Sequence, residues 1–263
     1  MATAAFPLPA FSMHRLLKQA LAVAVTEWRL LPWNPADPIK APKVKRTNMR
    51  ALDTMGTAAL LEAARPYRLF IPVMLVVTFG LRRGEICAVC WRHVELSGAA
   101  QLSIVGSTEQ TKAGTREKGT KSGRARTVAL TAIAIEELRR HKARQAEELL
   151  RLGVRQTDDM YIVAQADGQP LKPNSLTHEF VRFIAGTALP RVRFHDLRHS
   201  HATHLLASGV HPKIAQERLG HATVAITLDL YSHVLPGMQT DAASRVDEAL
   251  QQALDRYCGT AKG

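Results

Sequence analysis

Residues 194–203 read FHDLRHSHAT, and the interpretation of the whole chain turns on this stretch. His195 and Arg198 stand three positions apart, so in a helix their side chains share a face. A fixed cation beside a titratable imidazole suits a phosphate, because the arginine holds charge while the histidine moves a proton. Such pairs are also common on solvated helix faces, so this stretch alone only nominates a phosphate site.

Four further patches place polar side chains inside otherwise apolar sequence: GLRRGE at 80–85, TKSGR at 120–124, LGH at 219–221 and YSH at 231–233. Arg82 follows Gly80 at a predicted junction of two helices, which puts a guanidinium near a helix N-terminus, a natural anion site. Glu85 either orients Arg82 or a neighbour, or is simply an acid in the first turn of a helix. Tyr231 follows an apolar helix; with a reference pKa of about 10, it needs nearby cations or a base to act as a nucleophile.

Basic residues are concentrated between positions 112 and 126, where six Lys and Arg stand against the single acid Glu117. We interpret this segment as a hairpin that enters a DNA groove and delivers one lysine to a reacting phosphate. A solubilising loop is the alternative. Lys112, Lys118 and Lys121 are the candidate lysines on this element.

The composition points to a polyanionic partner. The chain has 263 residues with a formal net charge of +12, and 46% of its residues are apolar, enough for a folded core. The three cysteines imply no disulfide framework, and Cys87 and Cys90 are read as core residues rather than zinc ligands. With no apolar run long enough to span a membrane and no secretory signal, we expect a cytoplasmic, nucleoid-associated protein with no membrane partner.

Hydrophobic periodicity predicts an α+β chain, mainly α, with a small antiparallel sheet or hairpin. Strands are expected near 102–105, 127–130 and 160–163. Helices are expected near 13–31, 54–64, 66–79, 85–90, 131–153, 174–186, 196–208, 212–219, 223–230 and 242–257.

Taken in order, the patches spell R…K…H-x-x-R…G-H…Y, and here the sequence resembles the tyrosine recombinase, or phage integrase, family. The resemblance covers about residues 53–257 and rests on GLRRGE at 80–85, FHDLRHSHAT at 194–203, ERLGH at 217–221 and TLDLYSHV at 227–234. It implies that family's catalytic-domain fold and a site-specific recombinase, or integrase. Such an enzyme cuts and rejoins DNA through a 3′-phosphotyrosyl intermediate.

The resemblance also implies roles for the charged residues of the site. Tyr231 attacks the scissile phosphate, and Arg82 and Arg198 hold its non-bridging oxygens. Lys121 protonates the 5′-oxygen; it is preferred because TKSG before a basic strand looks most like the family's hairpin. No metal and no ATP are needed, because these cations supply the charge and the phosphotyrosine preserves the energy of the broken bond.

By the same resemblance, His195 assists proton transfer to and from the nucleophile. His221 donates a hydrogen bond to the phosphate, and Glu85 supports the site without contacting the phosphate itself.

The segment 1–50 consists of one predicted helix and a proline-rich basic linker. It resembles the last helix of the N-terminal core-binding domain with which the family clamps DNA. The interpretation is therefore a core-binding remnant and linker at 1–50, a catalytic domain at 51–257 and a tail at 258–263. Fifty residues with one amphipathic helix cannot bury a core. The alternative function is thus a truncated integrase that binds DNA without completing recombination.

The expected partners follow from the same resemblance. Double-stranded attachment-site DNA is the substrate, and the residues expected to contact it are Lys43, Lys45, Arg46, Lys112, Lys118 and Arg124. The last helix is expected to dock on a neighbouring protomer in a homotetramer on DNA, or else to pack on its own domain. A full-length integrase or an accessory DNA-bending or directionality factor could also take part. A type IB topoisomerase shares this chemistry, but the sequence around Tyr231 favours an integrase.

Overall fold

A computed structural model of the chain describes residues 10–41, 51–111, 114–119, 125–231, 243–244, 246–248 and 250–254. The chain forms two compact units, Met1–Asn48 and Met49–Gly263.

The first unit contains helix α1, Ala10–Thr26. The predicted helix at 13–31 ran too far, because Arg29 has a left-handed φ of 51° and Trp28 lies beyond the helix end, 65% exposed. After the helix, the Asn34 amide donates to the carbonyl of Lys18 at 3.0 Å, and its oxygen accepts from the backbone of Ala36 at 2.9 Å. These two bonds fold the exit segment back against α1.

The second unit opens with three helices, and Arg82 lies at the junction of the second and third. Helix α2, Thr54–Ala64, begins where predicted, and its N-cap Asp53 accepts from the amide of Gly56 at 2.7 Å. Helix α3 spans Phe70–Phe79, so the predicted start at 66 was wrong; residues 66–69 form turns instead. Helix α4 is Arg83–Ala88, followed by the short 3-10 helix η1, Trp91–His93.

The strands form two small antiparallel sheets. Strands β1 (Val94–Glu95), β2 (Gln101–Ile104) and β5 (Arg126–Ala129) make the first, in the order β1-β2-β5. Strands β3 (Gly106–Thr111) and β4 (Gly114–Gly119) form a hairpin. The strand predicted at 160–163 was wrong: Tyr161 makes only an isolated bridge to Cys90.

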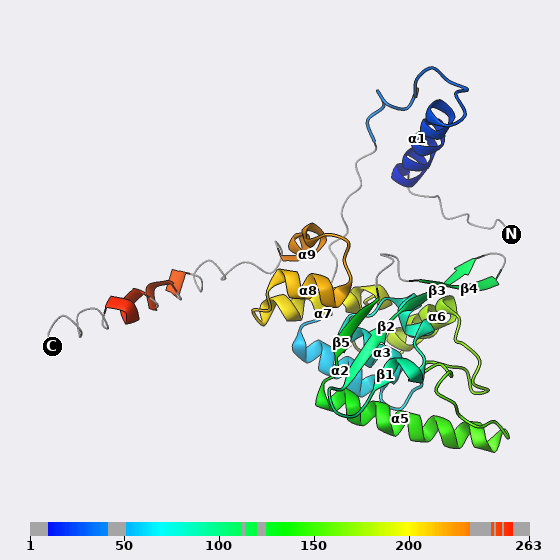
Figure 1. The fold of residues 1–263 in the computed structure, drawn as a ribbon, viewed down its shortest axis with the longest axis vertical. Coiled ribbons are helices and arrows are strands. Elements are labelled where there is room, and N and C mark those ends of the chain that lie inside the picture. The colour runs from blue at the N-terminus through cyan, green and yellow to red at the C-terminus, as the bar shows by residue number, and fades with distance from the viewer. Residues whose placement is uncertain are drawn as a thin grey trace. The chain divides into compact units, whose positions relative to one another are not determined.

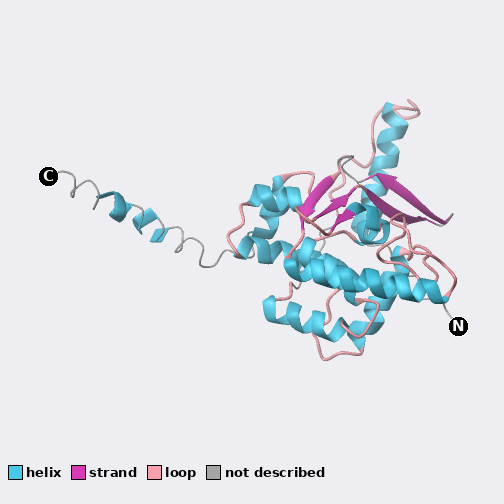
Figure 2. Ribbon diagram, turned by 60° about the horizontal axis from the view of Figure 1, so that its bottom comes forward, coloured by secondary structure: helices cyan, strands magenta, loops and turns pink. Residues whose placement is uncertain are grey.

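Five further helices follow up to residue 231, close to the predicted ranges: α5 (Ala132–Arg151), α6 (Pro173–Ala185), α7 (Phe194–Ala207), α8 (Pro212–Leu219) and α9 (Val224–Tyr231). Figure 1 shows α7, α8 and α9 grouped on one side of this unit, with α5 running beneath the sheet. Helices make up most of the unit and the strands gather in one region (Figure 2). This is the α+β, mainly helical fold that the sequence predicted.

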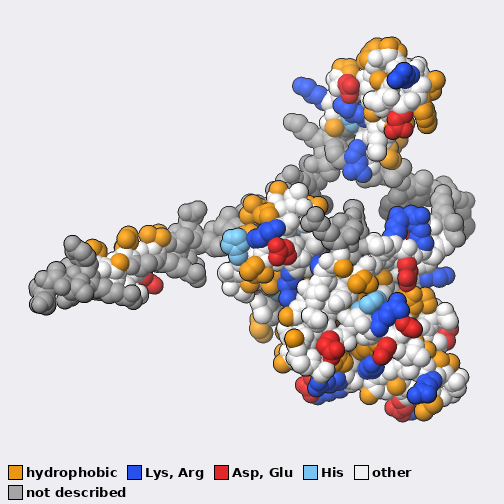
Figure 3. Space-filling view, in the orientation of Figure 1, with side chains coloured by type: hydrophobic (Ala, Val, Ile, Leu, Met, Phe, Trp, Pro, Cys, Tyr) orange, Lys and Arg blue, Asp and Glu red, His pale blue; other side chains and the backbone are white. Residues whose placement is uncertain are grey.

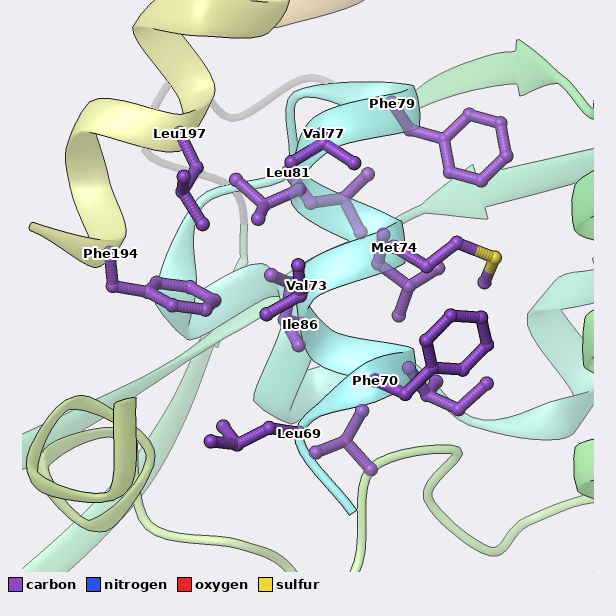
Figure 4. Packing of buried hydrophobic residues seen from close by; sticks show 14 of the residues in the cluster. Leu69, Phe70, Val73, Met74, Val77, Phe79, Leu81, Ile86, Phe194 and Leu197 are labelled. Carbon is purple, nitrogen blue, oxygen red and sulfur yellow. The ribbon is translucent and has the colours of Figure 1, made fainter. Parts of the chain in front are cut away.

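The core is built around α3, whose described side chains are nearly all buried. Phe194 and Leu197 of α7 point toward Val73 and Val77 of α3 (Figure 4). This packing fixes the helix that bears His195 and Arg198 against the helix that ends at Gly80, so two of the sequence patches are brought together by the core.

Cys87 and Cys90 are both buried, as predicted for core cysteines.

Residues 243–244, 246–248 and 250–254 are helical, and the side chains of Val246, Leu250 and Leu254 are 60%, 58% and 58% exposed. Within the described ranges, every helix is too short or too polar to cross a membrane.

Candidate active site

Three arginines from distant segments meet at the C-terminal end of α8. Arg126, Arg198 and Arg82 donate, in that order, to the successive backbone carbonyls of residues 218–220. The distances are 2.9 Å from Arg126 Nε and 2.7 Å from Arg82 Nη2. The last carbonyls of a helix lack partners within the helix and carry a partial negative charge. The end of α8 is therefore a natural support for a cluster of cations.

Glu85 supplies the carboxylate of this cluster and is almost fully buried. It accepts from the backbone N–H of Arg82 at 2.8 Å and from Arg82 Nη1 at 2.9 Å. Arg126 donates to both of its oxygens, at 2.9 and 2.7 Å. Burial by itself would raise the pKa of Glu85, but the bonds and charges of Arg126 and Arg82 outweigh it and hold that pKa below its usual value. Glu85 is thus an ionised carboxylate shared by two arginines. It also lies in the first turn of α4, so both features that the sequence offered for it are present.

Arg198 lies behind Arg82, on α7, and is only 4% exposed. Its two terminal nitrogens donate to the carbonyls of Gly80 and Leu219, so it joins the end of α3 to the end of α8. Burial and the neighbouring Arg82 cation lower the pKa of the Arg198 guanidinium. A buried cation beside other cations is stabilised by an arriving anion.

Two glycines make these carbonyls available. Gly80 and Gly220 both end helices in the left-handed region, with φ of 66° and 64°. A Cβ on Gly80 would lie 2.6 Å from a ring atom of His201 and 2.6 Å from a methyl of Leu219. The glycines of the GLRRGE and LGH patches are therefore required by backbone geometry and by close packing.

The two histidines of the predicted set lie in different surroundings. His195 is exposed on α7, one turn before Arg198, and its ring stands edge-on to His199 at 5.1 Å. Partial desolvation of the ring, together with His199 and Arg198, lowers its pKa. The Nδ1 of His221 lies 3.0 Å from the hydroxyl of Thr227, and burial with the nearby arginines lowers the pKa of His221 to about 4. In both rings the lowered pKa favours the neutral form.

The other described histidines of α7 serve the fold. His201 Nδ1 bonds the carbonyl of Val77 at 2.9 Å, and His204 Nε2 bonds that of Leu52 at 2.9 Å. Among the described residues, no group of three or more His, Cys, Asp or Glu side chains is arranged to hold a metal ion.

Tyr231 is the last residue of α9, and its side chain lies outside the described part of the structure. Of the DNA-contact candidates only Lys118 is described: it lies on β4, half exposed, 2.7 Å from Glu109. The favoured lysine and the remaining DNA-contact candidates lie outside the described residues: Lys43, Lys45, Arg46, Lys112, Lys121 and Arg124.

Sequence reasoning missed Arg126 and Thr227 as members of the site. Arg126 was counted only as hairpin charge, and Thr227 only as part of the sequence before Tyr231. On the face shown in Figure 3, Lys and Arg side chains are interspersed with Asp and Glu, so surface charge there does not single out a site. The cluster of three arginines around the buried carboxylate of Glu85 does.

The chain belongs to the phage integrase family, because the model of that family matches residues 49–237, more than half of the chain. It is 28% identical over 199 residues to a XerC-like tyrosine recombinase of Caldanaerobacter subterraneus subsp. tengcongensis, covering 71% of this chain and 51% of that protein. It is also 28% identical over 250 residues to the ICEBs1 integrase of Bacillus subtilis, covering 89% of this chain and 64% of the relative. The chain thus spans between about half and two thirds of the length of these relatives.

Solved structures of the same fold include the Tn1549 transposon integrase in complex with a circular intermediate DNA, with a TM-score of 0.74 at 17% identity over 89% of this chain and 78% of that one. A lambda integrase tetramer bound to a Holliday junction gives a TM-score of 0.58 at 20% identity, over 83% of this chain and 57% of that one. At these identities the likeness establishes the fold.

Proposed function

We propose that this chain is a site-specific tyrosine recombinase that cuts and rejoins DNA through a phosphotyrosyl link at Tyr231. The observation that supports this most is the convergence of Arg82 and Arg198 at the end of α8, beside the neutral His221. Helix α9 starts at Val224, three residues after His221, and ends at Tyr231. The nucleophile thus lies on the helix that follows the cation cluster directly.

Arg82 and Arg198 bind the non-bridging oxygens of the scissile phosphate in this proposal. A guanidinium has five N–H donors. Within the described part of the chain, Arg82 and Arg198 each use two terminal nitrogens on the protein, which leaves N–H groups for a phosphate. Donors already fixed in place stabilise the charge that develops in the transition state without reorganisation.

Cleavage then forms a bond between the Tyr231 oxygen and phosphorus and breaks the bond from phosphorus to the 5′-oxygen. The tyrosine proton passes to His195, whose lowered pKa leaves it neutral and able to accept. Lys121 protonates the departing 5′-oxygen, and His221 donates to the phosphate. Rejoining runs the same steps in reverse with a 5′-hydroxyl as the nucleophile, so no metal or ATP is required.

The substrate in this proposal is double-stranded attachment-site DNA. Its backbone is contacted by basic residues of the linker and of the segment around the hairpin, namely Lys43, Lys45, Arg46, Lys112, Lys118 and Arg124. Residues 51–257 form the catalytic domain, and the exposed Val246, Leu250 and Leu254 dock on a neighbouring protomer in a homotetramer. A full-length integrase or an accessory DNA-bending factor joins the same nucleoid-associated complex.

The test uses nicked suicide duplexes taken from the DNA that flanks the gene of this chain. Wild type is expected to form a covalent protein–DNA adduct, and Tyr231→Phe is expected to form none. No adduct from wild type on any of these duplexes would contradict the proposal. An adduct without strand exchange would favour the DNA-binding, non-recombining alternative, and relaxation of plasmids that lack the site would favour a topoisomerase.

The choice of lysine has its own test. A duplex with sulfur in place of the bridging 5′-oxygen has a leaving group that needs no proton, since a thiol has a pKa of about 8.5. Lys121→Ala is expected to be slow on the normal duplex and to recover on the sulfur duplex. Lys112→Ala and Lys118→Ala are expected to cleave both alike; recovery by one of them instead would move the assignment.

A further inference from the structure

Arg126 is the third arginine of the cluster, and all of its described side-chain hydrogen bonds are to protein groups of two other elements. It begins β5, and its side chain is 12% exposed. Nε donates to the carbonyl of Arg218 at 2.9 Å, while Nη1 and Nη2 donate to the two oxygens of Glu85 at 2.9 and 2.7 Å. This forked pairing fixes the plane of the carboxylate as well as its position.

The carboxylate that Arg126 holds is the one that orients Arg82. Glu85 Oε1 accepts from Nη1 of both arginines. If Arg126 were absent, Arg82 would be the nearest remaining cation for a buried carboxylate, and it would turn to form the two-bond pair with Glu85 itself. Its N–H groups would then face Glu85 and not a phosphate. Arg126 therefore keeps Arg82 available by satisfying Glu85.

Close packing against Gly220 adds a second constraint on the same side chain. A Cβ at Gly220 would lie 2.9 Å from Arg126 Nη1 and 3.1 Å from its Cζ. The guanidinium thus lies directly on the residue whose carbonyl accepts from Arg82. Through Glu85 and through the end of α8, Arg126 fixes both groups that hold Arg82.

We propose that Arg126 is a positioning residue for DNA cleavage, acting through Glu85 and the α8 carbonyls to set Arg82 for the scissile phosphate. The proposal rests on the proposed function. In the sequence Arg126 follows Lys121 by five residues, so its anchorage also fixes the start of the strand that follows the lysine. Arg126 itself is not assigned a contact with the reacting atoms.

The experiment measures single-turnover cleavage of a nicked suicide duplex by Arg126→Met and Arg126→Lys. Arg126→Met is expected to cleave about 100-fold more slowly at saturating DNA, the scale of losing one fixed donor in a transition state. The DNA dissociation constant is expected to stay within about threefold, so the loss falls on the rate and not on binding. Arg126→Lys keeps one charge and is expected to recover part of the rate.

A second duplex separates positioning from simple structural support. It has a neutral methylphosphonate at the scissile position, so that less positive charge is needed from Arg82. The defects of Arg126→Lys and Arg82→Ala are both expected to shrink on this duplex. Glu85→Gln combined with Arg126→Met is expected to be no slower than either single variant, because the residues act as one unit.

Arg151→Ala is the matched control, because Arg151 pairs with Glu147 on the exposed face of α5. It is expected to match wild type on both duplexes. Cleavage by Arg126→Met within threefold of wild type would overturn the proposal. If Arg126→Met fails to fold, an Arg126→Lys defect of equal size on the charged and neutral duplexes would overturn it as well. Failure of wild type to cleave would instead contradict the proposed function.

Discussion

The Nδ1 atom of His221 lies 3.0 Å from the hydroxyl of Thr227, a residue that is fully buried in α9. The contact joins the residue just past the end of α8 to the helix that ends at Tyr231. A hydroxyl that donates to Nδ1 leaves the Nε2 position with the proton, which is the form that can donate to a phosphate. Thr227 is therefore expected to set both the orientation and the tautomer of His221.

Thr227→Val tests this relationship by replacing the hydroxyl with a methyl group of similar size. We expect DNA cleavage to slow about 10-fold, because a positioned hydrogen bond contributes on the order of 1 kcal/mol and the ring loses its fixed tautomer. DNA binding should be unchanged. Thr227→Ser keeps the hydroxyl and should cleave at nearly the wild-type rate. A valine variant as fast as wild type would show that Thr227 has no part in the site.

A second contact holds the β3–β4 hairpin to the body of the second unit. The hydroxyl of Tyr161 donates to the carboxylate of Glu117 on β4, which, together with burial, raises the pKa of Tyr161 to about 12. Gln110 on β3 also accepts from the backbone of Asn174, at 3.1 Å. The hairpin is thus attached through both of its strands.

Tyr161→Phe is expected to release the β4 attachment without unfolding the unit. A hydrogen bond to a charged group contributes about 1.5–3 kcal/mol. Amide hydrogen exchange across 106–119 should therefore become faster by about 10-fold or more, while exchange in α3 stays unchanged. Tyr67→Phe, which alters an exposed tyrosine outside the hairpin, is the control. Equal protection of the hairpin in wild type and Tyr161→Phe would exclude this attachment.

The sequence predicted the parts of the site that depend on local structure. Arg82 at the start of a helix and Arg198 one turn after His195 both follow from helix periodicity and capping. Arg126 could not be predicted, because its place depends on the register of β5 against β2, which pairs Arg126 with Ile104. Its acceptor at residue 218 is a backbone carbonyl, and a carbonyl has no sequence signature.

The errors have the same origin. The apolar run at 160–163 was expected to form a strand, but its residues pair only through the Tyr161–Cys90 bridge. The helix expected to reach residue 31 ends at Thr26, since Arg29 takes a left-handed conformation and its neighbours Trp28 and Leu30 donate back to the carbonyls of residues 23 and 24. Tertiary packing decides such boundaries, and a residue pattern alone carries no information about that packing.

The two helix-ending glycines should respond differently to substitution. Gly80→Ala combines a strained left-handed backbone with overlap on His201 and Leu219, so we expect the free energy of unfolding to fall by about 2–4 kcal/mol. Gly220→Ala carries a similar backbone strain, but its Cβ meets the end of the Arg126 side chain. Its free energy of unfolding should fall by only about 1 kcal/mol, while its cleavage rate should fall by more than that of Gly80→Ala. Urea unfolding measures the loss of stability, and single-turnover cleavage measures the loss of rate. Equal rate losses in Gly80→Ala and Gly220→Ala, measured where both variants are folded, would contradict the distinction.

Buried His201 predicts how stability depends on pH. Its Nδ1 bonds the carbonyl of Val77, and its Nε2 is buried without a hydrogen-bond partner among the described residues. Burial, together with Arg218, Arg198 and His204, lowers the pKa of His201 to about 3. In the unfolded chain the pKa is about 6.5, so between these values the unfolded state binds a proton that the folded state does not.

The contribution of the neutral His201 to the free energy of unfolding is therefore fully present above pH 6.5 and is lost as the pH falls toward 3. At pH 5 the loss amounts to about 2 kcal/mol, from 1.36 kcal/mol for each pH unit below 6.5. His201→Asn removes the titration and keeps a nitrogen able to bond Val77. Urea unfolding at pH 7.5 and pH 5 should show wild type losing about 2 kcal/mol more than this variant, and His221 should add a further loss in both proteins. If both proteins lose the same amount, His201 is not a buried neutral histidine.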